Sequence, residues 1–133
     1  MSMTDPVGDL LTRIRNASKA RKPAVDVPAS KLKREIVRIL TENKFLRDFV
    51  ELPDNKQGII RVYLRYSRDD EPVIKGIERV SKPGLRQYVG AGDVRSSTYN
   101  MRGMQIISTS TGVMTNFDAA RQNVGGELIM RCW

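Results

Sequence analysis

Residues 59 to 66 alternate between apolar and polar side chains, which is the period of a β-strand with one buried face. The apolar positions are Ile60, Val62, Leu64 and Tyr66, and the polar positions are Arg61, Tyr63 and Arg65. Such a strand needs a covering layer on its apolar side, while its polar side can face solvent. The chain is therefore restricted to folds in which other elements cover one face of a sheet.

Two amphipathic segments can supply that layer. Apolar side chains recur every three or four residues in 5–18, where Pro6 suits the first helical position, and again in 30–43, where Ser30 is the predicted N-cap. The predicted strands of this part of the chain are 24–27, 45–52, 59–66 and 73–80. The first 80 residues thus read α-β-α-β-β(-β), with both helices on one face of a small sheet.

The motif Ser81-Lys82-Pro83-Gly84 interrupts this pattern and is the predicted boundary between two lobes. We expect an N-terminal α/β lobe of residues 1–80 and a smaller, mainly β C-terminal lobe of residues 81–133. The second lobe is predicted to hold strands at 85–89, 104–109 and 127–133, one short helix at 115–123, and a Gly/Ser-rich loop at 90–102. The predicted fold class is therefore α+β with two lobes.

Positive charge is concentrated in the first quarter of the chain. The net charge is +8 overall, and residues 10–40 carry nine Lys and Arg against two Asp and Glu, which is +7. A basic patch on a folded protein indicates a polyanionic partner, most often nucleic acid. From the charge alone, a solvated helix face remains the alternative.

Several classes of function are excluded by residues that the chain lacks. It has no His and a single cysteine, Cys132, so it has no His-based acid–base pair, no internal disulfide and no four-thiolate zinc site. No phosphate-binding Gly motif, no apolar run of membrane-spanning length and no signal-peptide core is present. We therefore expect an intracellular protein that is not an enzyme and that holds neither metal nor cofactor.

Four consecutive hydroxyl side chains, Ser108 to Thr111, follow an apolar strand and precede Gly112. Hydroxyl groups both donate and accept, so such a row can bridge 2′-hydroxyls, phosphates and base edges in the shallow minor groove of an RNA helix. Gly112 would allow a close approach of the backbone. A Ser/Thr-rich turn that hydrogen-bonds its own backbone is the alternative for this segment in isolation.

The segment ISTSTGVMT, followed by AARQNVGGELI and a final aromatic residue, closely resembles the C-terminal motif of the bacterial form of the eighth small-subunit ribosomal protein family. Three further blocks agree with that family in order and spacing: DPVGDLLTRIRNA, PASKLKREI and RVSKPGLRQY. The resemblance covers essentially the whole chain.

This resemblance implies a two-lobed structural constituent of the small (30S) ribosomal subunit that binds the central domain of 16S rRNA and aids subunit assembly. In some bacteria such proteins also bind the mRNA of their own operon and repress its translation. Neighbouring small-subunit proteins would be further partners. The implied location is the small ribosomal subunit in the cytoplasm, or in an organelle of bacterial descent.

The resemblance also assigns RNA-binding residues. It places the main RNA-contacting turn at Ser108, Thr109 and Ser110, next to Thr111 and Gly112. The remaining assigned positions are Tyr88, Gly125, Gly126, Glu127, Arg13, Arg15, Asn16 and Lys31. For Glu127 two roles stay open: accepting a hydrogen bond from a base amino group, or anchoring the turn through its backbone.

Two departures from the family accompany these assignments. Thr111 stands where the family usually has Lys, which removes one phosphate contact. Residues 90–102 also differ from the usual Gly-Leu-Gly link, and Arg95 and Arg102 add charge there.

Two other classes of function are the alternatives to RNA binding. A protein-interaction adaptor would use Arg61, Tyr63 and Arg65 on the open sheet face to bind an acidic partner. An RNA-modifying enzyme is disfavoured because the chain lacks His and any cofactor loop.

Overall fold

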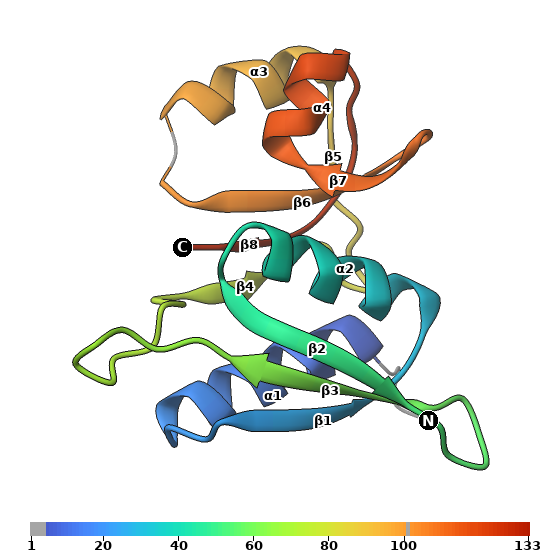
Figure 1. Ribbon diagram of the computed structural model, residues 1–133. Helices are drawn as coiled ribbons and strands as arrows, with labels where there is room; N and C mark the ends of the chain where they lie inside the picture. The colour runs from blue at the N-terminus through green and yellow to red at the C-terminus, as the bar shows by residue number, and fades with distance from the viewer. Residues whose placement is uncertain (1–4, 101) are drawn as a thin grey trace. The chain divides into compact units, whose positions relative to one another are not determined.

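The computed structural model describes residues 5–100 and 102–133, and these residues form four helices and two antiparallel sheets (Figure 1). The helices are α1 (Pro6–Lys19), α2 (Lys31–Glu42), α3 (Ala91–Asn100) and α4 (Asn116–Gln122). The strands are β1 (Ala24–Pro28), β2 (Leu46–Leu52), β3 (Ile59–Leu64), β4 (Ile77–Arg79), β5 (Tyr88–Val89), β6 (Met104–Thr109), β7 (Gly112–Thr115) and β8 (Gly126–Cys132). The predicted α+β class is confirmed.

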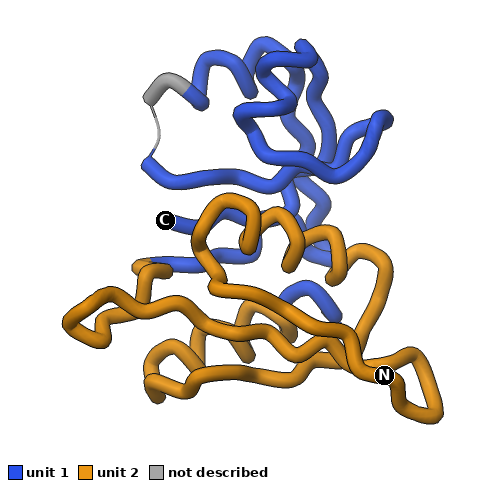
Figure 2. Tube along the Cα trace, viewed as in Figure 1, with its two compact units in different colours: residues 1–8, 76–133 blue, residues 9–75 orange. Residues whose placement is uncertain are grey.

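The chain divides into two compact units (Figure 2). Asp9–Lys75 forms one, and residues 5–8 together with Gly76–Trp133 form the other. We call them the first and the second unit. β4 belongs to the second unit because it pairs with β8. The division into functional lobes of residues 1–80 and 81–133 stays a prediction.

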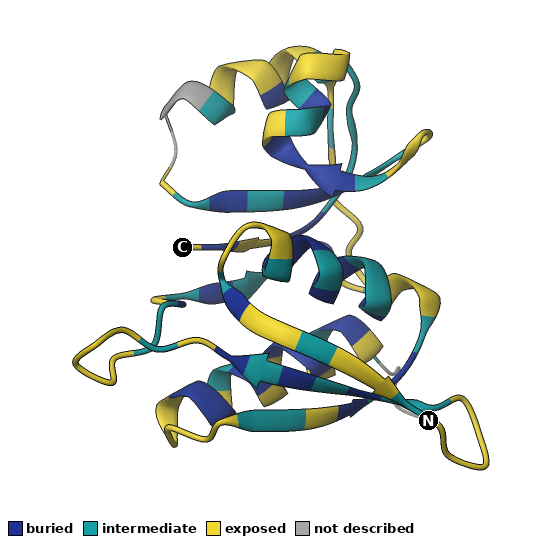
Figure 3. Ribbon diagram, in the orientation of Figure 1, coloured by how far each residue is buried: buried dark blue, intermediate teal, exposed yellow. Residues whose placement is uncertain are grey.

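The first unit contains a three-stranded sheet in the order β1-β3-β2. Along β3, Ile60, Val62 and Leu64 are buried, whereas the residues between them are partly exposed, so one face of the sheet is covered (Figure 3). The covering apolar side chains of the helices are fully buried: Leu10, Leu11, Ile14, Ile36, Val37 and Leu40. The alternation in the sequence therefore selects the buried face of this sheet.

The second unit contains a five-stranded sheet in the order β4-β8-β6-β7, and β5 pairs with β8 as well. Helices α3 and α4 contribute Val94 and Ala119 to a core that also contains Ile107 and Met114. Helix α4 begins as predicted, because the Thr115 side chain accepts a hydrogen bond from the Asp118 backbone N–H at 3.1 Å.

The prediction of an irregular loop at 90–102 and of one short helix in this part of the chain is wrong, because Ala91–Asn100 forms α3. The sequence of α3 has little helical periodicity, and among the side chains of this helix that the structure describes, the apolar Val94 is buried in the core. A polar network adds to this: buried Asn116 donates to the Thr98 hydroxyl at 3.1 Å and accepts from the Gln105 N–H at 2.9 Å. Tertiary contacts thus override weak local propensity.

The Ser30 cap offers a test of the first unit. Its hydroxyl accepts a hydrogen bond from the Lys33 backbone N–H at 3.2 Å, as expected for the predicted N-cap. We expect Ser30→Ala to lower the free energy of unfolding by about 1 kcal/mol, because an N–H at the helix start loses its acceptor. Urea denaturation measures this. Ser110→Ala, which removes an exposed hydroxyl, is the matched control, and equal effects of both substitutions would contradict the capping role.

Candidate nucleic-acid interface

The hydroxyl row forms the tip of the β6–β7 hairpin, where Thr109 pairs with Gly112 and the two residues between them form the turn. The Thr109 hydroxyl donates to the Gly112 carbonyl at 2.8 Å and accepts from the Thr111 backbone N–H at 3.2 Å. The Thr111 hydroxyl donates to the Gln122 side-chain oxygen at 3.2 Å. Two of the four hydroxyls therefore stabilise the turn and its contact with α4.

Ser110 and Gly112 form the open part of this tip. Ser110 is exposed, and within residues 5–100 and 102–133 its hydroxyl has no hydrogen-bond partner. Gly112 has a φ of +130°, which favours glycine, and apart from its own chain neighbours no atom of the described residues lies within 4 Å of the place where a Cβ would be. The tip thus presents a free hydroxyl beside an unobstructed stretch of backbone.

Strand pairing brings three of the predicted residues into one row. Tyr88 on β5 lies opposite Glu127 on β8, and Glu127 lies opposite Ser108 on β6. Residues directly opposite in an antiparallel sheet have their side chains on the same face. Tyr88 is 71% exposed, so the row offers a stackable ring, an acid and a hydroxyl on one surface.

Gly125 and Gly126 allow the strands on either side of them to come close. A Cβ on Gly126 would overlap the Ser108 carbonyl, and a Cβ on Gly125 would overlap the Val89 carbonyl. Both obstacles are backbone atoms, which side-chain rotation does not remove. In this structure, the two glycines serve to hold β6 and the end of β5 against β8.

The Glu127 carboxylate is tied to the segment that precedes β5. Its Oε2 accepts hydrogen bonds from the Ser81 hydroxyl at 2.6 Å and from Arg86 Nη1 at 2.9 Å. Burial, the largest single influence, acts to raise the pKa of Glu127. The hydrogen bonds from Ser81 and Arg86 and the positive charges of Arg86 and Arg79 outweigh it, so the pKa lies below its ordinary value.

These contacts bear on the two roles left open for Glu127. The carboxylate does anchor structure, but through the side chains of Ser81 and Arg86 and not through the backbone of the hydroxyl turn. In the part of the chain that the structure describes, no hydrogen bond reaches its other oxygen, Oε1. Glu127 thus has one oxygen bound internally and one left to accept a hydrogen bond from a ligand.

Ser81 and Arg86 were not among the predicted site residues. Ser81 is completely buried, and its hydroxyl also accepts from the Gln87 backbone N–H at 3.1 Å. The block RVSKPGLRQY contains both residues, but nothing local in it indicates a partner 41 or 46 positions later in the chain. The pairing of β4 and β5 with β8, together with backbone hydrogen bonds such as that from the Ser81 N–H to the Leu128 carbonyl at 3.1 Å, brings the two segments together.

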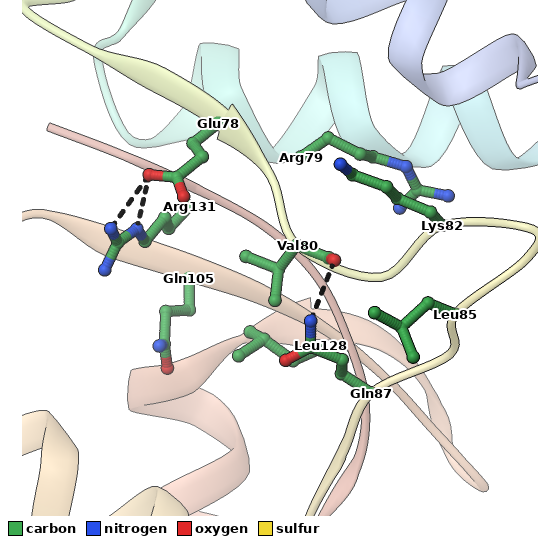
Figure 4. A pocket seen from close by; sticks show the side chains of 9 residues that line it. All are labelled: Glu78, Arg79, Val80, Lys82, Leu85, Gln87, Gln105, Leu128 and Arg131. Atoms are coloured by element: carbon green, nitrogen blue, oxygen red, sulfur yellow. Dashed lines mark hydrogen bonds and ion pairs between the residues drawn. The ribbon is translucent and has the colours of Figure 1, made fainter.

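A groove of about 390 Å³ lies in the same unit, and its lining side chains are drawn in Figure 4: Glu78, Arg79, Val80, Lys82, Leu85, Gln87, Gln105, Leu128 and Arg131. Glu78 and Arg131 face each other across 2.8 Å as an ion pair (Figure 4). The Arg79 guanidinium is 3.3 Å from the Asp5 carboxylate. Because most of its charges are paired internally, the groove lacks the strong positive excess that favours phosphate.

The basic residues predicted for the N-terminal surface lie in the first unit. Arg13 donates to the Asp9 carboxylate at 2.9 Å and to the Asp26 carbonyl at 3.1 Å. Arg15 is half-buried, whereas Asn16 and Lys31 are exposed. Because Arg13 and Arg15 are two positions apart in α1, they flank its apolar stripe from opposite sides.

Much of the positive charge between residues 10 and 40 is neutralised by ion pairs. Its Arg residues pair with acids as follows: Arg13 with Asp9, Arg21 with Glu71, Arg34 with Glu51, and Arg38 with Glu35 and Glu42. Lys33 is buried, its ammonium donates to the Pro28 carbonyl at 3.0 Å, and burial lowers its pKa. The exposed cations Lys19, Lys22 and Lys31 have no ion-pair partner among the described residues.

Other features of the described residues limit what this protein does chemically. They include no group of three or more potential metal-ligating side chains, and none of their helices is long and apolar enough to cross a membrane. Cys132 is buried, and burial raises the pKa of its thiol to about 12, so the thiolate is scarce at neutral pH.

The family described as Ribosomal protein S8 matches residues 5–133. The chain belongs to this family. Three proteins named "Small ribosomal subunit protein uS8" are similar to it over the full length of both chains: those of Leuconostoc mesenteroides (52% identical), Leuconostoc citreum (53%) and an Anaeromyxobacter species (55%). The family that the sequence motifs indicate is thus confirmed. Because this is a family of ribosomal proteins and not of enzymes, the prediction that the protein is not an enzyme is confirmed as well.

Glu127→Gln tests the carboxylate anchor. A group with a lowered pKa in the folded state stabilises that state above its ordinary pKa, and the contribution disappears as the pH falls through the folded-state value. At pH 7 we expect Glu127→Gln to reduce the free energy of unfolding by about 1 kcal/mol, because charge-assisted hydrogen bonds become neutral ones. Urea denaturation should show the difference from wild type shrinking as the pH falls below the ordinary range of Glu. A pH-independent difference would refute the anchor.

Proposed function

We propose that the protein is a structural constituent of the small ribosomal subunit that binds the central domain of 16S rRNA and aids subunit assembly. Membership of the ribosomal protein S8 family and the names of the full-length relatives support the ribosomal part of the proposal. The row of Tyr88, Glu127 and Ser108 beside the hydroxyl turn carries the RNA-binding part.

This row suits an RNA helix with irregular pairing. The minor groove of such a helix presents 2′-hydroxyls and base edges, which exchange hydrogen bonds with the Ser110 hydroxyl and with Glu127 Oε1. The exposed Tyr88 ring provides a surface on which an unpaired base stacks. Because an acid is repelled by phosphates, Glu127 favours sites where a base amino group or a ribose hydroxyl reaches it.

The basic residues of the first unit have a different task. Lys31, Lys22 and Lys19 are exposed and hold no ion pair with the described residues, so they are available to phosphates. Phosphate neutralisation supplies affinity and steers association without selecting a sequence. In this proposal the first unit supplies non-specific affinity, and the second unit supplies recognition.

The same contacts extend the proposal to other partners. An mRNA of the protein's own operon that folds into a similar irregular helix would meet the same donors and acceptors, and its translation would be repressed. Within the small subunit, neighbouring ribosomal proteins would cover surfaces that RNA leaves free. The proposed location is the small ribosomal subunit in the cytoplasm.

The adaptor alternative gains no support from the open face of the three-stranded sheet. Arg61 is bound to the Asp26 carboxylate at 2.8 Å, Arg65 donates to the Lys44 carbonyl at 3.3 Å, and Arg47 lies over the Tyr63 ring. These groups already have partners, so an acidic ligand would have to displace them.

Footprinting of the purified protein on small-subunit rRNA tests the proposal directly. Protection confined to one irregular helix of the central domain is the expected result. Protection scattered over unrelated helices, or none at all, would show that the protein is not a specific binder of this RNA.

Ser110→Ala should weaken binding to the protected helix alone. The hydroxyl has no partner within the described residues, so folding should hardly change, but an RNA group buried against it would lose its partner at a cost of roughly 1–3 kcal/mol. This corresponds to about 5- to 150-fold in affinity. Filter-binding titrations on the cognate helix and on a random duplex measure it, with thermal melts as the folding control. Equal weakening on both RNAs would place recognition elsewhere.

Replacing Arg13, Arg15 and Lys31 together by Ala should weaken binding to cognate and random RNA alike. The slope of log affinity against log salt should become shallower by up to ~0.7–0.9 for each phosphate that the variant no longer neutralises. A variant with Lys56, Arg68 and Lys75 replaced by Ala removes the same charge from other exposed positions of the first unit and should keep the wild-type slope. Identical slopes for the two variants would remove the predicted surface from the interface.

A further inference from the structure

An open groove of about 340 Å³ runs along α1 beside β1 in the first unit. We call its apolar lining residues, Ala17, Ala20 and Val25, the floor, and its polar lining residues, Arg13, Asn16 and Lys22, the rim. The surface within it is mainly apolar, and no acidic residue lines it. Two of the predicted RNA-binding residues, Arg13 and Asn16, therefore lie at the edge of an apolar recess.

The end of α1 creates this recess. The Lys22 N–H donates to the Ala17 carbonyl at 2.9 Å and the Arg21 N–H to the Ser18 carbonyl at 3.1 Å, which is the Schellman pattern. Arg21 takes the left-handed conformation at the reversal, with a φ of +58°. The reversal carries the chain back along the helix as β1, and the small side chains of Ala17 and Ala20 leave the space between them open.

The rim carries the two kinds of group that bind a nucleotide: cations for phosphates and an amide for a base edge. From Arg13 to the end of α1 at Lys19 the helix rises by roughly 9 Å, and Lys22 follows the chain reversal, so Arg13 lies near one end of the groove and Lys22 near the other. Hydrogen bonds from Arg13 to Asp9 and to the Asp26 carbonyl hold its guanidinium in place. In the described residues, the Asn16 amide and the Lys22 ammonium have no hydrogen-bond partner, so both are free to bind a ligand.

We propose that this groove receives one unstacked nucleobase of the bound RNA, with Asn16 at its edge and with Arg13 and Lys22 on the phosphates to either side. The inference rests on the proposed RNA binding and makes it more specific. An apolar floor accepts the face of a base, and an amide offers both the donor and the acceptor that a base edge uses.

Charge favours RNA over a peptide as the occupant. The first unit carries 16 Lys and Arg against 10 Asp and Glu. Among the described residues that line the groove there are two cations and no acid; Arg13 is paired with Asp9, whereas Lys22 has no ion-pair partner in the described part of the chain. An apolar peptide side chain would need no such charges. If a peptide occupied the groove, filling the groove would leave RNA binding unaffected.

Filling the groove tests the inference. Ala20 is exposed and directly follows the last residue of α1, so Ala20→Leu occupies the recess without entering the core. Thr12→Leu adds similar bulk at an exposed position of the same helix that does not line the groove, and it is the matched control. We expect Ala20→Leu to bind the protected rRNA fragment about 5- to 150-fold more weakly, which is the range for losing one stacked base, and Thr12→Leu to bind like wild type. Thermal melts check that all three proteins are equally folded.

A scan with single abasic substitutions in the same RNA fragment identifies the base. At one position, the abasic substitution should lower the affinity of the wild-type protein by the same factor as Ala20→Leu does. The same abasic substitution should not lower the affinity of Ala20→Leu any further. The inference would be overturned if Ala20→Leu bound the fragment with wild-type affinity. It would also be overturned if every abasic substitution weakened binding to Ala20→Leu by the same factor as binding to wild type. In either case the RNA-binding function would stand. A wild-type protein that binds no rRNA fragment would instead refute the proposed function itself.

Discussion

Strand β8 is hydrogen-bonded along both of its edges, and the candidate RNA-recognition surface depends on this. One edge pairs with β6, while the other pairs first with β5 and then with β4. The three residues of the recognition row come from three strands that are adjacent only because β8 lies between the other two. Gly125 and Gly126 make the pairing possible, since a side chain at either position would overlap the backbone of a neighbouring strand.

Local patterns in the sequence predict most of the elements. The alternation in 59–66, the helical periodicity of 5–18 and 30–43, and the cap Ser30 each depend on residues a few positions apart, and each corresponds to an element of the structure. Helix α3 has no such local pattern, because the contacts that the structure shows for it, the packing of Val94 against the core and the hydrogen bond from Asn116 to Thr98, involve residues distant in the sequence. The predicted strand at 73–80 is shorter in the structure, where β4 covers Ile77–Arg79, and its partner β8 lies some fifty residues later, so no local pattern marks its ends.

In the candidate site, too, some features can be predicted from the sequence and others depend on contacts between distant residues. The family resemblance points to Ser110 and Tyr88, which are both exposed, and the structure brings the latter into register with Glu127. No sequence pattern predicts the partners of Glu127 or the neutralisation of the basic stretch. Arg34 meets Glu51 and Arg21 meets Glu71, and these pairs depend on strand order and not on sequence spacing. The positive charge of a segment therefore overstates the charge available to a ligand.

The position of β8 in the chain also has a consequence for biosynthesis. The ribosome makes β4, β5 and β6 before β8, so during synthesis these strands exist for a time without the neighbour that joins them. The first unit is complete by Lys75, and it can form while the second is still being made. A nascent chain thus acquires its basic surface before its recognition row. Under the proposed function, such a chain would associate weakly with many RNAs before it became able to distinguish among them.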